Sequence, residues 1–342
     1  MKKLISIFLI IVMVFSIFAC NQNDPSKNEG SGDGESASAF PITVTDHAGR
    51  KVIIEEKPEK LVSGYYISTS ALIALDLDEK LVGIEAKANS RPIYALSAPA
   101  LIDLPNVGTA KEFNMEGCLA LNPDLVILPL KLKNAAEQLE SLGVDVLLVN
   151  PENQELLESM INMLGAATGT QEKAKALLGF ANTQEAMLAT VLKDISAPKV
   201  YLAGNSSMLS TAGDAMYQSD MIRNAGGINA AKEIADNYWV EISYEQLLAW
   251  DPEYIVLASD AKYTVNDVLA DPNLAGCTAV KNGNVYQMPS KAEAWDSPVP
   301  SGILGSLWLA SVLHAEEFTE AECNALIDEY YETFYSFKYS EN

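Results

Sequence analysis

The sequence contains few histidines and none of the common catalytic motifs. It contains two histidines, His47 and His314, and no G-x-S-x-G, G-x-x-x-x-G-K-[ST] or H-E-x-x-H motif. Glu293 and Asp296 could form an acid–base pair, but with 46 acidic residues in 342 such a pair carries little information. We therefore expect no catalytic site, no cofactor, and no site for a bare metal ion, which would need more histidine ligands.

Aromatic side chains lie instead near the ends of predicted strands, where α/β folds place their ligands. An aromatic-rich rim there suits a large, flat or partly apolar ligand. Any one of these rings could equally belong to the core. The candidate ligand-binding residues are Tyr65, Tyr66, Arg91, Tyr94, Lys111, Phe113, Met208, Tyr238, Trp239, Glu293, Trp295 and Asp296.

The candidate ligand-binding residues must be positioned by helices and strands, and some of these belong to a unit that occurs twice in the sequence. NMEGCLALNPDLVIL at 114–128 and SYEQLLAWDPEYIVL at 243–257 align without gaps, and the matching residues include Glu116 with Glu245. In each copy a short helical face stops before a proline, which disfavours helix in the residue preceding it. Four apolar residues follow, typical of a strand buried on both faces. Each copy is therefore the helix-to-strand half of an α/β unit.

The remaining pattern predicts an α/β protein of two lobes, with parallel-type sheets flanked by helices and joined by one long rigid helix. Strand candidates include KLVSGYY, KLVGIEA and DVLLVN in the first lobe, and KVYLAG and NVYQMP in the second. Thr170 is expected to cap the connecting helix. The predicted boundaries are 40–168 for the first lobe, 169–196 for the connecting helix, and 197–342 for the second lobe with two closing helices.

The first residues indicate the compartment. Lys2 and Lys3 precede an apolar run that ends at Ala19, which predicts a signal peptide over 1–19. Ala19-Cys20 resembles a bacterial lipobox, so we expect Cys20 to be lipidated and residues 20–39 to form a flexible tether. The formal charge of −23 argues against a nucleic-acid partner. The expected location is the extracytoplasmic face of the cell membrane, with Cys20 as the anchor.

From Phe40 to about Tyr335 the chain resembles the helical-linker, or class III, solute-binding proteins of bacterial ABC importers. The resemblance rests on the repeated E-x6-P-[DE] unit, the long central helix, and the segments TVTDHAGRKVIIEEKPEKLV, AVKNGNVYQMPS and SPVPSGILGSLWLASVLHAEEF. It implies a ligand cleft between two lobes, delivery to an ABC permease dimer with its ATPase, and ligands such as ferric siderophores, haem or corrinoids. The protein is expected to act as a monomer.

The resemblance also implies roles for the paired glutamates. In the family, one acidic residue on each lobe contacts the permease, and the matching positions here are Glu116 and Glu245. Two equivalent acidic residues suit a two-fold symmetric partner. The alternative is that each glutamate stabilises the first turn of its helix.

The ligand is expected to be an Fe(III) chelate, most consistent with a ferric siderophore. Arg91 and Lys111 are the basic residues nearest the predicted cleft, which suits a neutral or cationic hydroxamate-type chelate better than an anionic catecholate. A corrinoid receptor would favour a tryptophan in both lobes, yet Trp239 has Ala110 as its counterpart. A haem receptor with Tyr65 or Tyr66 as axial ligand, and a surface sensor of the same fold, remain alternatives.

Overall fold

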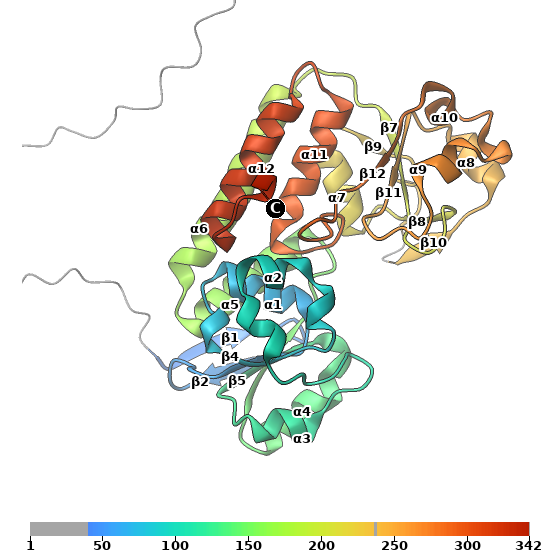
Figure 1. Ribbon diagram of the computed structural model, residues 1–342. Helices are drawn as coiled ribbons and strands as arrows, with labels where there is room; N and C mark the ends of the chain where they lie inside the picture. Colours follow the sequence, from blue (N-terminus) through green and yellow to red (C-terminus); the bar gives the residue numbers. More distant parts are fainter. Residues whose placement is uncertain (1–39, 236–237, 342) are drawn as a thin grey trace, which may run out of the picture. The chain divides into compact units, whose positions relative to one another are not determined.

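The computed structural model describes residues 40–235 and 238–341, which fall within one compact unit. The predicted signal peptide, Cys20 and the tether lie outside the described residues. Two four-stranded parallel sheets form the framework (Figure 1). The first sheet belongs to residues 40–149, here called the N-terminal half, and the second to residues 199–341, here called the C-terminal half.

The first sheet has the strand order β4-β3-β5-β6. Its strands are almost entirely buried, because apolar runs such as LVILP pack between two helical layers. An antiparallel hairpin, β1 (Ile42–Thr45) with β2 (Lys51–Ile54), precedes it. The other elements of this half are β3 (Leu61–Ser63), α1 (Tyr66–Ala74), β4 (Leu81–Ile84), α2 (Pro92–Ser97), α3 (Met115–Ala120), β5 (Leu125–Pro129), α4 (Lys133–Ser141) and β6 (Asp145–Val149).

The second sheet has the strand order β12-β11-β7-β9, and β8 pairs with β10 in a separate antiparallel ribbon. The prediction of parallel sheets flanked by helices is confirmed. The elements of this half are β7 (Lys199–Ala203), β8 (Ser210–Ala212), α7 (Tyr217–Asn224), β9 (Ile228–Asn229), β10 (Trp239–Glu241), α8 (Tyr244–Trp250), β11 (Tyr254–Leu257), α9 (Val265–Leu269), α10 (Thr278–Asn282), β12 (Val285–Gln287), α11 (Ile303–Leu313) and α12 (Glu320–Tyr335).

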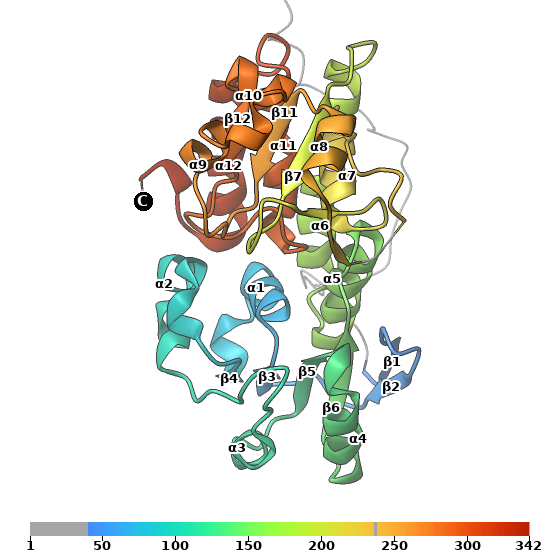
Figure 2. The same cartoon turned by 90° about the vertical axis from the view of Figure 1, so that its right-hand side faces the viewer.

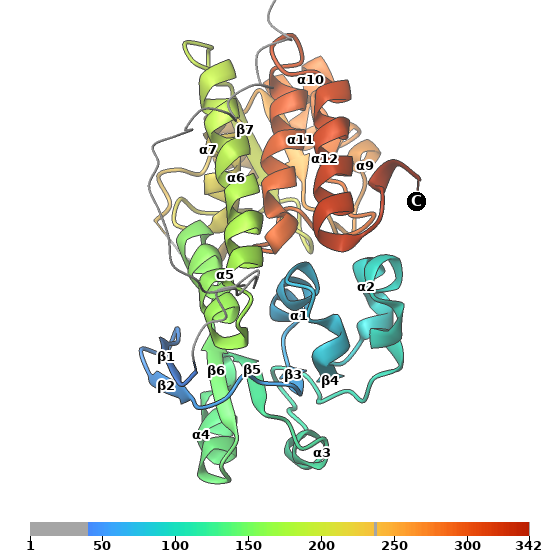
Figure 3. The ribbon, with the colours of Figure 1, turned by 90° about the vertical axis from the view of Figure 1, so that its left-hand side faces the viewer.

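Two helices connect the halves. Helix α5 (Gln154–Thr168) ends at Gly169, whose φ of 70° is the left-handed conformation that glycine adopts readily at a helix end. Helix α6 (Gln171–Val191) follows and spans about 30 Å at 1.5 Å per residue. Figures 2 and 3 show α5 and α6 running side by side, with α6 reaching the closing helices. Thr170 sits at the N-cap as expected, but its side chain makes no capping hydrogen bond.

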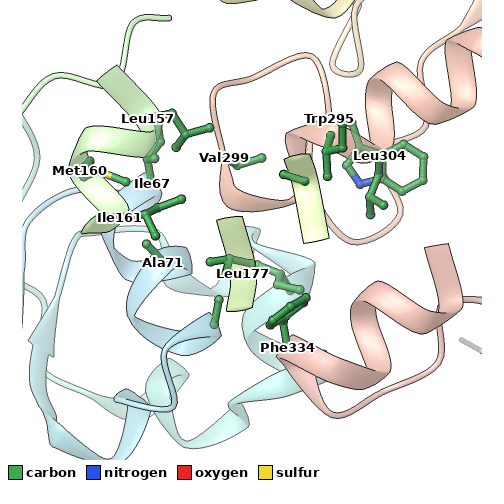
Figure 4. Close-up of a cluster of buried hydrophobic side chains, with 14 of the residues drawn as sticks. Ile67, Ala71, Leu157, Met160, Ile161, Leu177, Trp295, Val299, Leu304 and Phe334 are labelled. Carbon is green, nitrogen blue, oxygen red and sulfur yellow. The ribbon is translucent and has the colours of Figure 1, made fainter. Parts of the chain in front are cut away.

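The two halves share one apolar core (Figure 4). Ile67 of α1, Leu157 of α5, Leu177 of α6 and Phe334 of α12 all belong to a single buried cluster. Helix α12, which was assigned to the second lobe, therefore packs against helix α1 of the first. The predicted lobe boundaries describe the order of the chain, but the structure joins the lobes by direct packing as well as by the connecting helix.

The repeated unit has the same structure twice, as helix α3 with strand β5 and helix α8 with strand β11. Asn114 and Ser243 cap the two helices through their side chains. Asn122 and Asp251, each before a proline, adopt φ values of 50° and 44°. Each helix ends before its proline, as predicted from the restriction that proline places on the preceding residue. The structure ends each helix with a left-handed residue, which Asn and Asp tolerate better than most side chains.

Candidate ligand-binding cleft

Two adjoining cavities lie between the N-terminal and C-terminal halves, near the carboxyl ends of β3, β7 and β11. They have volumes of about 260 and 220 Å³, and Tyr66, Asn205 and Ser297 line both. Since both halves contribute to each wall, a ligand held there would contact both. We refer to the two cavities together as the cleft.

Tyr65 and Tyr66 are placed in the cleft by the end of strand β3. Gly64 allows the turn because a Cβ atom there would lie 2.6 Å from a Leu128 methyl group. Tyr65 is the N-cap of α1 and Tyr66 its first residue, and their rings meet edge to face at 5.3 Å. Burial is the main cause that raises the pKa of both phenols. Both tyrosines therefore present neutral aromatic surfaces to a ligand.

Arg91 is the one basic side chain among the described residues that line these two cavities. It precedes α2 as the N-cap residue, and its guanidinium carbon lies 4.0 Å from the centre of the Tyr66 ring. This cation–π contact fixes the guanidinium against the wall. Exposed acidic residues also line the cleft, Asp260 in the first cavity together with Arg91, and Glu152 in the second.

Tyr94 also reaches the first cavity, although it is only 1% exposed. Its hydroxyl donates to Glu85 Oε1 at 2.6 Å, and the Thr69 hydroxyl donates to Glu85 Oε2 at 2.7 Å. Burial raises the pKa of Glu85, while these two donors act in the opposite direction. Sequence reasoning missed Glu85, because one acidic residue after a strand has no distinguishing pattern in a chain this acidic.

Glu293 and Asp296 lie in the loop of residues 289–299, which we call the cleft loop. Glu293 accepts hydrogen bonds from the Ser70 hydroxyl at 2.6 Å and the Ser301 hydroxyl at 2.5 Å. Asp296 accepts from the Ser259 hydroxyl at 2.5 Å and from the Ser259 backbone at 3.0 Å. Burial raises the pKa of both carboxyls. Both line the cleft, but their oxygens are already engaged in holding the loop.

Tyr238 and Trp239 form the outer rim of the second cavity. Tyr238 is 74% exposed, and Trp239 is 38% exposed at the start of β10. The Trp239 ring packs on Gly204, where a Cβ atom would come within 3.0 Å of two ring carbons. The absence of a side chain at position 204 therefore lets the indole lie flat beside the end of strand β7.

Four predicted ligand-binding residues lie elsewhere. Phe113 is partly buried against a core cluster of the N-terminal half, and Met208 is partly buried against the core of the C-terminal half. Lys111 is exposed in the turn that closes between Gly108 and Phe113. Trp295 is 1% exposed and donates its indole N–H to the Tyr331 hydroxyl of α12 at 2.9 Å. Neighbouring residues of one loop can face either the cavity or the core, and the sequence alone does not show which of them faces the cavity.

The cleft also contains residues that were not predicted individually. Asn205 and Ser297 line both cavities, and Gln218 lines the second. Gln218 donates through its amide to the Asp296 carbonyl oxygen at 2.7 Å, which leaves its own oxygen without a partner. The signal that could have found Asn205 is its place directly after strand β7; the others carry no local signature.

Glu116 and Glu245 occupy equivalent exposed positions, each the second residue of its helix. The backbone at the start of α8, with the Ser243 hydroxyl, lowers the pKa of Glu245. This fits stabilisation of the helix start, and it leaves the carboxylate exposed. The structure therefore leaves both roles open to these glutamates.

The two histidines have structural contacts. His47 lies in the turn between β1 and β2, where its Nδ1 accepts from the Asn150 backbone at 2.8 Å, and His314 Nε2 lies 3.2 Å from the Gly226 carbonyl oxygen. Among residues 40–235 and 238–341, no group of His, Cys, Asp and Glu is arranged to hold a metal ion. None of the helices described there has both the length and the apolar character that a membrane crossing requires.

Known proteins share this architecture. The profile of the family described as periplasmic binding protein matches residues 61–292. The chain is 25% identical to the molybdate-binding protein MolA of Haemophilus influenzae, over 86% of this chain and 91% of that protein. It is 27% identical to the Fe(3+)-citrate-binding protein YfmC of Bacillus subtilis, over 83% and 89%. A periplasmic solute binding protein from Veillonella parvula matches with a TM-score of 0.75 and 26% identity, over 87% and 93%.

Proposed function

The chain belongs to the periplasmic binding protein family and is a substrate-binding protein of an ABC importer, and from this premise we propose that its ligand is a ferric siderophore. The protein is a transport component rather than an enzyme. It captures the chelate in the cleft, undergoes partial closure about the connecting helices, and delivers the chelate to a dimeric permease with its ATPase. No bond is made or broken on the binding protein.

The composition of the cleft walls supports a large, partly apolar chelate. Tyr65, Tyr66 and Trp239 supply aromatic surface to the two cavities. Polar residues such as Asn205 and Ser297 line the same cavities, and walls that combine aromatic and polar groups suit a ligand whose metal is wrapped in an organic shell of mixed polarity.

The charged residues that line the cleft are the observation that limits the class of ligand. Arg91 is the one basic residue among the described residues that line the cleft, and the exposed carboxylates of Glu152 and Asp260 line it as well, so the cleft offers an anion little net attraction. A site for molybdate or for a highly anionic catecholate chelate is expected to contain more basic residues than the single Arg91. The cleft therefore supports a neutral or cationic chelate, which is the charge of many ferric hydroxamates.

The alternatives within the same importer class are less well supported. Haem held by Tyr65 or Tyr66 would require a deprotonated phenol, and burial raises the pKa of both. A corrinoid with flat aromatic contacts on both faces would find Trp239 in the C-terminal half, but Ala110 is the counterpart of that residue in the N-terminal half.

A thermal-shift panel tests the ligand class, because a ligand stabilises the native state by mass action. The panel contains ferrichrome (neutral), ferrioxamine B (cationic), ferric enterobactin (anionic), ferric citrate, molybdate, haem and cyanocobalamin. We expect a shift with the two hydroxamates and a smaller or no shift with the anions. A shift with molybdate alone, or with a corrinoid alone, would show that the siderophore assignment is wrong.

The partner and the location are part of the same proposal. Glu116 and Glu245, one on each half, meet basic residues on the two permease subunits. Cys20 carries the lipid that holds the protein, as a monomer, on the extracytoplasmic face of the cell membrane. Incorporation of a radiolabelled fatty acid into the wild-type protein, and its loss in Cys20→Ala, tests the anchor.

A further inference from the structure

The cleft loop, residues 289–299, lines both cavities and yet contains no helix or strand. Ser290 and Ala292 line the first cavity, and Ser297 lines both. Backbone hydrogen bonds of a regular element therefore cannot be what fixes its shape. Glu293 and Asp296 hold the loop through the hydrogen bonds described above, and side chains on its far side make further contacts.

Trp295 is the largest of these side chains. It is 1% exposed, and its indole N–H donates to the Tyr331 hydroxyl at 2.9 Å. The indole ring also lies 5.3 Å from the ring of Tyr339, centre to centre. Figure 4 shows Trp295 pointing toward Leu304 of helix α11, among the buried apolar side chains. Trp295 therefore joins the cleft loop to Tyr331 of helix α12 and to Tyr339.

Residues 336–341 fold back against helix α12. Ser336, with a φ of 61°, ends helix α12 and turns the following residues back along it. Tyr339 stacks on Tyr331 with their ring centres 5.5 Å apart. The backbone N–H and the hydroxyl of Ser340 donate to the Asp328 carboxylate at 2.8 and 2.6 Å. We call residues 336–341 the C-terminal strap.

The strap contacts the cleft loop at a second point. Lys291 Nζ donates to the Tyr339 carbonyl oxygen at 2.8 Å and lies 4.9 Å from the centre of the Tyr339 ring. Tyr339 therefore touches the loop through both Lys291 and Trp295. These two residues flank Ala292, Glu293 and Ala294, which line the first cavity.

We propose that the C-terminal strap is a positioning element of the ligand site, in which Tyr339 holds the cleft loop in the shape that forms the cleft wall. The proposal rests on the proposed function only in that the ligand binds in this cleft. A cavity of about 460 Å³ adjoins Trp295 and Tyr339. Removing the Tyr339 ring would enlarge that space and leave Trp295 with one fewer packing partner.

Hydrogen–deuterium exchange of the full chain tests the proposal without a ligand. In Tyr339→Ala, we expect amides of residues 290–298 to exchange about tenfold faster, because local opening reports local stability. Tyr339→Phe keeps the ring and should exchange like the wild type. Asp328→Ala, which frees Ser340 without emptying the aromatic cluster, should give a smaller increase in the same peptide. If Tyr339→Ala fails to fold, Asp328→Ala still tests whether the strap holds the loop.

Binding provides the second measurement. The affinity of Tyr339→Ala for ferrichrome should fall about tenfold, with Tyr339→Phe restoring it. Unchanged exchange of residues 290–298 in both Tyr339→Ala and Asp328→Ala would overturn the proposal. Faster exchange with unchanged ferrichrome affinity would show that the strap does not position the ligand site. If ferrichrome does not bind the wild type, the proposed ligand is wrong, and the exchange measurement still decides whether the strap holds the loop.

Discussion

The Ser70 hydroxyl on helix α1 lies 2.6 Å from a carboxylate oxygen of Glu293 in the cleft loop, so the two halves of the protein are hydrogen-bonded across the base of the cleft. Ser70 is 1% exposed and Glu293 is 8% exposed. The Tyr335 hydroxyl of helix α12 also lies 3.0 Å from the Ser70 hydroxyl. Lobe motion about α5 and α6 must either preserve this contact or break a buried polar network.

Ser70→Ala should destabilise the protein. It removes a donor from a buried carboxylate, and an unsatisfied buried group costs about 1–3 kcal/mol. Urea denaturation should show a lower midpoint with an unchanged m value. Ser141→Ala, which removes an exposed hydroxyl that donates to the Gln138 carbonyl oxygen, is the matched control and should leave the midpoint within error. Equal midpoints for both variants would contradict a stabilising role for the contact.

Glu293 should also make stability depend on pH. Burial raises its pKa in the folded state above the ordinary value of 4.5. Between the two values the native state binds more protons than the unfolded state, so the free energy of unfolding falls as the pH rises. The contribution of Glu293 is thus complete below about pH 4.5 and is lost as the pH rises through the raised pKa.

Glu293→Gln isolates this contribution, because glutamine has a similar shape and does not titrate. We expect the variant to lose less stability than the wild type between pH 5 and pH 8, measured by urea unfolding at each pH. The comparison is between the two slopes, since other groups titrate in both proteins. A variant slope equal to the wild-type slope would mean that Glu293 does not titrate in this range.

Asp260→Asn tests how the cleft selects the charge of its ligand. Asp260 is exposed and lines the first cavity together with Arg91. Removing its charge should weaken binding of cationic ferrioxamine B about threefold to tenfold, as expected for one screened charge pair. Neutral ferrichrome should bind with unchanged affinity in the same titration calorimetry series. Equal losses for the two chelates would indicate a steric role for Asp260 instead.

The fold was largely predictable because its strands are short apolar runs and several helices, among them α3, α5 and α8, begin at a capping side chain. The repeat at 114–128 and 243–257 gave strands β5 and β11 directly. What could not be predicted was contact between distant segments. Trp295 is one residue from the cleft-lining Ala294, yet it faces Tyr331, which lies 36 residues later. Hydrophobic periodicity indicates which face of a helix or strand is buried, but it does not indicate which residues of a loop face a cavity.

The repeat also contained a second pair of acidic residues whose role only the structure reveals. Asp124 accepts hydrogen bonds from the backbone of Glu59 and Lys60 at 2.9 and 2.8 Å, just before strand β3. Glu253 accepts from the Lys199 backbone at 2.9 Å, at the start of strand β7. Each therefore ties the strand of its own repeat to the neighbouring strand of its sheet. Asp124 and Glu253 are exposed, as Glu116 and Glu245 are, but their carboxylates accept hydrogen bonds from the start of the neighbouring strand.

The two pairs of acidic residues permit a test of permease docking, in which the pair Asp124 and Glu253 serves as the control for the pair Glu116 and Glu245. Glu116→Arg with Glu245→Arg should abolish uptake by the reconstituted importer while leaving the affinity for ferrichrome unchanged, because opposite charge would meet the basic residues expected on the permease. Asp124→Ala with Glu253→Ala should lower the urea midpoint, because two strand starts lose acceptors, and should leave uptake per folded molecule intact. Loss of ferrichrome binding in the first double variant, or undiminished uptake by it, would contradict the assignment of Glu116 and Glu245 to the permease contact.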